Sequence, residues 1–75
     1  MREVDLTIQT PEAFGQWVRG HRKRLGLSQS EVADVIGVNR RVLGQLERGK
    51  PTVQLWIALS AAQAVGLDIS LHARP

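Results

Sequence analysis

The chain has 75 residues, enough for one small domain, and its ten basic and seven acidic side chains give a formal net charge of +3. It contains no cysteine, which excludes disulfides and thiolate metal sites and favours an intracellular protein. The longest apolar run covers only residues 55–59, whereas a membrane-spanning helix needs ~18 apolar residues. We therefore expect a cytoplasmic protein with no membrane contact.

Capping residues and glycines predict four helices in the middle of the chain. Thr10 and Asn39 have side chains that favour the N-cap position, and Ser28 with Glu31 three residues later has the signature of a capping box. The fourth helix is expected over about residues 53–65. A glycine is expected to end each helix, at Gly26, Gly37, Gly49 and Gly66.

The apolar residues of each predicted helix share one side, which predicts a common core. The residues expected there are Phe14, Trp17, Val18, His21 and Leu25 in the first helix, Val32, Ala33 and Ile36 in the second, Leu43 and Leu46 in the third, and Leu55, Ala58, Leu59, Ala62 and Val65 in the fourth. Trp56 and Ile57 lie away from this side of the fourth helix. They favour a dimer interface, or else a cover formed by the N-terminal segment.

Both ends of the chain alternate apolar and polar residues, as is typical of a β-strand. The alternating residues are Val4, Leu6 and Ile8 near the N-terminus and Leu67, Ile69 and Leu71 near the C-terminus. A single strand leaves its backbone N–H and C=O groups unpaired. We expect the C-terminal strand to pair with the N-terminal strand, with its counterpart in a second chain, or with both; frayed termini are the alternative.

The predicted third helix has an apolar side and a basic side. Each residue turns an α-helix by ~100°, which places Leu43 and Leu46 opposite a polar arc. Arginine fits the guanine edge in the DNA major groove and glutamine fits the adenine edge, so the arc favours a DNA-reading helix over a merely solubilising one. Glycine within this arc either lets the helix approach the groove closely or is only tolerated. The arc consists of Arg40, Arg41, Gly44, Gln45 and Arg48.

The run "LGLSQSEVADVIGVNRRVLGQLERGKP" resembles the Cro/cI-type (XRE) helix-turn-helix family. The resemblance implies a mainly α, four-helix, λ-repressor-like domain, with the helix-turn-helix at about residues 28–47. In that family the third helix reads DNA bases. The residues that this places at base edges are Arg40, Arg41 and Gln45.

The resemblance also implies a scaffold for the reading helix. Arg22 is expected to pair with Glu47, which would turn this acidic residue inward and neutralise it, and Gln29 is expected to bind a DNA phosphate. Other phosphate contacts are expected from the rim of the helix-turn-helix, because helix N-termini and basic side chains attract phosphate. The full set of expected phosphate contacts is Ser28, Gln29, Asn39, Arg48 and Lys50.

The two ends, "TPEAF" and "VGLDISLHARP", look like those of the HipB-like antitoxin and autoregulator subgroup. This likeness implies short N- and C-terminal β-strands that pair in a dimer, and a HipA-type kinase toxin as a partner. The expected organisation is an N-terminal strand or arm at 1–10, a DNA-binding domain at 11–66 and a dimerisation strand and tail at 67–75. The residues expected at the dimer interface are Trp56, Ile57, Ile69 and Leu71.

No residue pattern in the chain predicts catalysis. His21 and His72 have no neighbouring acids or nucleophiles at a spacing suited to a metal site or a general base, so we expect no enzyme, no metal and no cofactor. The predicted function is a homodimeric repressor that binds a palindromic double-stranded operator in the bacterial nucleoid, as an antitoxin regulating its own operon. The alternative is a protein-interaction module that keeps this fold but binds a partner protein instead of DNA.

Overall fold

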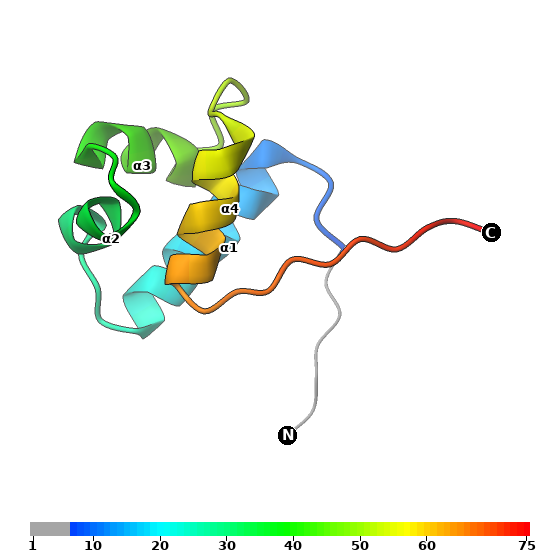
Figure 1. The fold of residues 1–75 in the computed structure, drawn as a ribbon, viewed down its shortest axis with the longest axis horizontal. Coiled ribbons are helices and arrows are strands. Elements are labelled where there is room, and N and C mark those ends of the chain that lie inside the picture. Colours follow the sequence, from blue (N-terminus) through cyan, green and yellow to red (C-terminus); the bar gives the residue numbers. More distant parts are fainter. Residues whose placement is uncertain (1–6) are drawn as a thin grey trace.

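Four helices make up the regular structure of residues 7–75, the part of the chain that the computed structural model describes (Figure 1). They are α1 (Pro11–Arg24), α2 (Gln29–Ile36), α3 (Arg40–Glu47) and α4 (Leu55–Ala64). The first three begin at the residue after each predicted cap, and α4 begins two residues later than predicted. None of these helices is long and apolar enough to span a bilayer.

The predicted caps bind the free N–H groups at the helix starts. Thr10 Oγ1 accepts a hydrogen bond from the backbone N–H of Ala13 at 3.1 Å. Ser28 and Glu31 form both halves of a capping box, each at 3.0 Å. Gly37 illustrates why a glycine ends a helix. Its φ of 79° is a left-handed conformation that side-chain-bearing residues rarely adopt. Local sequence therefore fixes where these helices begin and end.

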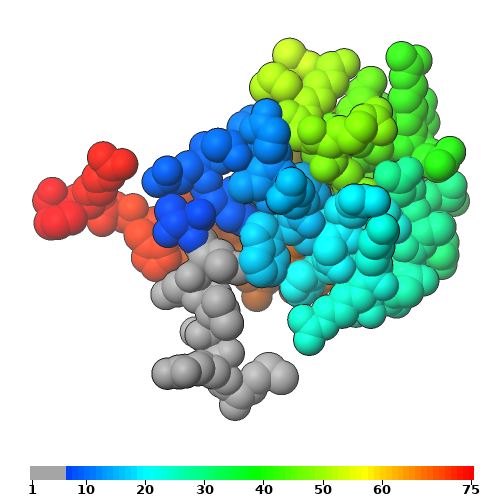
Figure 2. All heavy atoms as spheres, turned by 180° about the vertical axis from the view of Figure 1, so that it is seen from behind, coloured from blue at the N-terminus to red at the C-terminus, as the bar shows by residue number. Residues whose placement is uncertain are grey.

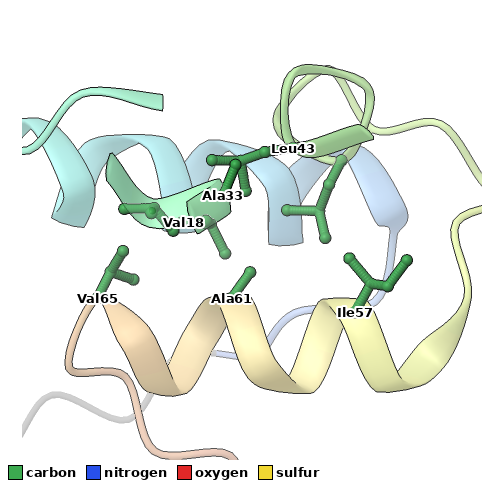
Figure 3. Packing of buried hydrophobic residues seen from close by; sticks show 8 residues of the cluster. Val18, Ala33, Leu43, Ile57, Ala61 and Val65 are labelled. Carbon is green, nitrogen blue, oxygen red and sulfur yellow. The ribbon is translucent and has the colours of Figure 1, made fainter. Parts of the chain in front are cut away.

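The core lies where α4 packs across the other three helices (Figure 3). Ile57, Ala61 and Val65 point from this helix towards Val18 of α1 and Leu43 of α3. The spacing of the three residues by four is that of one helix face. The full buried apolar set is Val18, Val32, Ala33, Leu43, Leu46, Ile57, Ala61, Ala62 and Val65.

The buried face of α4 differs in part from the one predicted. Ala62 and Val65 are buried as predicted, and Ala58 is partly buried. Leu55 and Leu59, expected in the core, are 71% and 45% exposed, whereas Ile57, expected at an interface, is 8% exposed. The segment "LWIALSAAQA" is apolar on nearly every side, so periodicity alone cannot choose the face that packs inward. Packing against the buried residues of the other helices decides the choice.

Two residues expected in the core, Trp17 of α1 and its C-cap Leu25, are also exposed. Trp17 is 37% exposed and Leu25 is 55% exposed, although Phe14 and His21 are partly buried as predicted. The buried side of α1 instead carries Gly15, Val18 and Arg22, and a Cβ atom on Gly15 would lie 2.7 Å from the carbonyl oxygen of Glu47. This close approach of α1 to the end of α3 turns the helix so that part of its apolar stripe faces solvent.

Residues 7–75 contain no β-strand. Leu67 still packs against the core, and the segment after it leaves the helices as an extended tail, at the end of the molecule opposite α2 and α3 (Figures 1 and 2). Ile69 and Leu71 are 46% and 95% exposed in it. Of the expected N-terminal strand, Val4 and Leu6 lie outside the described residues. A strand forms only with a partner strand, and within this part of the single chain the tail has none.

Candidate nucleic-acid interface

Helix α3 is anchored by two leucines and presents its polar residues to solvent. Leu43 is 0% and Leu46 is 4% exposed, and Asn39 Oδ1 caps the helix by accepting from the Val42 N–H at 3.1 Å. The sequence therefore predicted the inward side of this helix correctly. The exposed side, called the basic face below, consists of Arg40, Arg41, Gln45 and Arg48, of which Gln45 is half-buried and the arginines are exposed.

The basic face is interrupted within the predicted arc. Gly44, which lies between Arg40 and Arg48 around the helix axis, is buried beneath the side chains of Arg48 and of Gln29 from α2. Arg41, Gln45 and Arg48 remain within about 60° of one another around the helix axis, because each residue turns it by ~100°. Arg40 lies on the other side of Gly44. A helical wheel of α3 alone could not reveal this interruption, since Gln29 of α2 helps to cover Gly44.

A buried ion pair joins α1 to the end of α3. Arg22 donates from Nε to Glu47 Oε2 at 2.7 Å and from Nη2 to Glu47 Oε1 at 3.0 Å, a two-pronged contact. Its Nη1 donates to the carbonyl oxygen of Leu27 at 2.8 Å. Both residues are nearly inaccessible, at 7% and 5% exposed. Glu47 therefore faces the scaffold and adds no negative charge to the basic face.

Gln29 belongs to the same network, a role that its sequence neighbours do not indicate. Its Nε2 donates to Glu47 Oε1 at 3.0 Å, which fixes the amide at the start of α2 against α3. No local sequence signal reports this contact, because the two residues lie far apart in the chain. Gln29 is half-buried and keeps a second N–H on Nε2.

The network holds Glu47 in its charged form. Burial raises the pKa of the Glu47 carboxyl, but the hydrogen bonds from Arg22 and Gln29 and the charges of Arg22 and Arg19 outweigh it, so the pKa lies below its ordinary value of 4.5. The same contact raises the pKa of Arg22. At the start of α2, the backbone and side chain of Ser28 lower the pKa of Glu31 through the capping box.

The remaining expected phosphate contacts surround the basic face. Ser28 and Asn39 are exposed at the starts of α2 and α3, where each side chain serves as the helix cap. Lys50 is exposed just beyond α3. Within residues 7–75 the one ion pair is that of Arg22 with Glu47, so no carboxylate in this range neutralises the basic face.

The family model described as "Helix-turn-helix" (HTH_3) matches residues 18–70, which include α2, α3 and the turn between them. An HTH-type transcriptional regulator of Sinorhizobium fredii (strain NBRC 101917 / NGR234) is 42% identical over 66 residues, which cover 88% of this chain and 87% of that protein. The chain belongs to the helix-turn-helix family. These are DNA-binding transcriptional regulators and not enzymes.

Solved structures of other proteins share the fold. A structure described as "Structure of HipA-HipB-O2-O3 complex" contains a chain with a TM-score of 0.84 and 21% identity, and the match covers 95% of this chain and 100% of that one. The restriction-modification controller protein C.AhdI from Aeromonas hydrophila is 36% identical with a TM-score of 0.68, over 77% of this chain and 88% of that one. At 21% identity, the first likeness shows the fold alone.

Both histidines make contacts within the fold or the tail. Among residues 7–75 no three potential metal-ligand side chains come together. His21 Nδ1 lies 3.2 Å from the carbonyl oxygen of Val65, which ties α1 to the end of α4. His72 Nε2 lies 3.2 Å from Ser70 Oγ in the exposed tail.

The residues expected at a dimer interface fall into two groups. Trp56 is 51% exposed, and its indole N–H donates to Gln54 Oε1; Ile69 and Leu71 are exposed in the tail. The prediction that Ile57 lies at the interface is wrong, because this residue is buried in the core of its own chain. The exposed apolar residues of α4, called its apolar surface below, are Leu55, Trp56 and Leu59.

Proposed function

We propose that this protein is a sequence-specific repressor that inserts α3 into the major groove of double-stranded DNA. The observation that carries the proposal is the basic face, which no carboxylate of residues 7–75 neutralises and which Leu43 and Leu46 hold outward. A single helix fits the major groove, and arginine and glutamine recognise guanine and adenine edges there. The proposed base contacts are Arg40, Arg41 and Gln45.

The DNA backbone is proposed to bind around this helix. Exposed starts of helices α2 and α3 place backbone N–H groups beside Ser28 and Asn39, and helix N-termini favour phosphate. Such contacts fix the register of the protein on DNA without reading sequence. The proposed phosphate contacts are Ser28, Gln29, Asn39, Arg48 and Lys50.

The repressor is proposed to act as a homodimer on a palindromic operator. The apolar surface of α4 and the tail residues Ile69 and Leu71 offer the contacts, since large exposed apolar groups favour a protein interface. Tail residues 67–71 would become a strand when a second chain supplies the partner strand. Two recognition helices would then enter major grooves ~34–36 Å apart. Residues 1–10, 11–66 and 67–75 are proposed as arm, DNA-binding domain and dimerisation tail.

A toxin partner of the HipA kinase type is proposed as well, with this chain as the antitoxin that regulates their shared operon. The likeness of both chain ends to the HipB-like subgroup supports it, as does the fold shared with the chain of the HipA–HipB complex. Co-purification of the chain with the product of the adjacent gene tests the idea. Absence of a complex would restrict the proposal to DNA binding.

Selection of bound sequences from random duplex DNA tests the central proposal. We expect a palindromic consensus, and Arg41→Ala should weaken binding to it by ~1–3 kcal/mol and relax specificity at one base pair. Arg24→Ala is the matched control, because Arg24 is exposed in the last turn of α1 and is not part of the basic face. If no sequence is enriched and Arg41→Ala changes nothing, the chain is a protein-interaction module of this fold instead.

A further inference from the structure

Gly44 lies beneath two side chains that come from different helices. A Cβ atom built on it would lie 3.3 Å from Arg48 Nη1, and 3.8 Å from both Nε2 and Oε1 of Gln29. The missing side chain therefore leaves a notch on α3, called the Gly44 notch below, which the guanidinium of Arg48 and the amide of Gln29 fill together. This is why Gly44 is buried although it lies on a surface helix.

Backbone conformation does not explain a glycine at this position. The glycines with positive φ are Gly26, Gly37, Gly49 and Gly66, each next to a helix end, and Gly44 is not among them. It lies inside α3, where alanine would stabilise a helix better. Glycine leaves space at this position. The group that lies nearest to Gly44 in that space is the guanidinium of Arg48.

The two walls of the Gly44 notch differ in how firmly they are held. The Gln29 amide is fixed, because it donates to Glu47 at 3.0 Å and Glu47 is in turn held by both prongs of Arg22. Arg48 is exposed at the end of α3 and has no ion-pair partner within residues 7–75. A rigid amide donor and an unneutralised guanidinium thus meet at one point on the rim of the basic face.

We propose that Gly44 is a positioning residue, which seats Arg48 beside Gln29 so that the two side chains together hold one phosphate of the DNA backbone. Gln29 offers its second amide N–H and Arg48 offers its guanidinium N–H groups, and a phosphate oxygen accepts from both. The inference rests on the proposed DNA-binding function and deepens it. In this inference Gly44 makes room for Arg48, rather than letting α3 approach the groove more closely.

Gly44→Ala tests the proposal. The new methyl group would displace the flexible end of Arg48 rather than backbone, so the fold should survive and the melting temperature should stay the same or rise. We expect affinity for the selected operator and for random duplex to fall by the same factor, several-fold. The slope of log affinity against log salt should become shallower by ~0.9, the loss of one phosphate contact.

Two controls make this outcome decisive. Gly20→Ala introduces the same methyl group inside α1, where a Cβ would meet nothing within 4 Å, and should leave DNA affinity unchanged. In an Arg48→Ala background, Gly44→Ala should cause no further loss, because its partner is already gone. Both results together would support the proposed phosphate contact.

Other results would overturn the inference. If the parent chain binds its operator and Gly44→Ala leaves affinity unchanged, lowers it further in the Arg48→Ala background, or alters preference at one base pair only, the Gly44 notch does not position a phosphate contact. If the parent chain binds no duplex at all, the proposed function fails and this inference fails with it. The two failures are therefore distinguishable in one set of titrations.

Discussion

Helices α3 and α4 pack into the same core but expose surfaces of opposite character. α3 presents its basic face to solvent, whereas α4 presents its apolar surface. In α3 the apolar and polar residues already lie on opposite sides, so its own sequence sets its orientation. In α4 nearly every side is apolar, and neighbouring helices choose which residues become buried. The comparison shows that contrast between faces, rather than apolar content, makes a helix orientation predictable.

Removing Arg22, which holds Glu47 at the end of α3, should have the largest effect on stability. Arg22→Ala would leave Glu47 charged and buried without its partner, which typically costs ~3–5 kcal/mol of stability. Chemical denaturation monitored by circular dichroism measures this loss. Arg24→Ala, an exposed arginine of the same helix, should stay within ~0.5 kcal/mol of the parent. Equal effects of the two variants would show that the ion pair does not anchor α3.

A pair of leucine truncations tests the contrast directly. Leu43→Ala in α3 should cost ~2–5 kcal/mol, because Leu43 is fully buried and its removal leaves a cavity. Leu55→Ala in α4 should change the stability of the monomer by at most ~0.5 kcal/mol, since Leu55 is 71% exposed. Chemical denaturation at low protein concentration measures the stability of the monomer for both variants. A large loss for Leu55→Ala in the monomer would mean that α4 packs by the face first predicted.

The apolar surface of α4 is expected to matter for association rather than for folding. Trp56→Ala should weaken the proposed dimer by about 2 kcal/mol, as buried interface tryptophans do, with little change in helix content. Sedimentation equilibrium measures the dimer dissociation constant. Gln63→Ala, on an exposed position of the same helix, is the control. An unchanged dissociation constant for Trp56→Ala would move the interface away from this surface.

The smallest expected effect is a dependence of stability on pH. The folded state lowers the pKa of Glu47 and Glu31, so the unfolded state binds more protons in acid. Their stabilising contribution is complete well above the ordinary value of 4.5 and is lost as pH falls through the lower folded-state pKa values. Melting temperatures should therefore drop in acid. Glu47→Gln should flatten this drop, whereas Asp34→Asn, at an exposed acid on α2, should not.

The sequence by itself determined the local features of this protein. Each cap contact reaches only three residues along the chain, so the starts of α1, α2 and α3 and the glycines at helix ends were predictable from neighbours in sequence. The inward leucines and outward arginines of α3 were also predictable, because apolar and polar residues recur with the period of the helix. The family resemblance further implied the pairing of Arg22 with Glu47.

Only the tertiary structure decided the features that depend on which element lies next to which. It buried Ile57 instead of Leu55, covered Gly44 with side chains from two helices, and joined Gln29 to Glu47 across 18 positions of sequence. The predicted C-terminal strand is absent from the described chain because strand formation needs a partner. Such features arise from contacts between distant segments, and no periodicity within one segment encodes them.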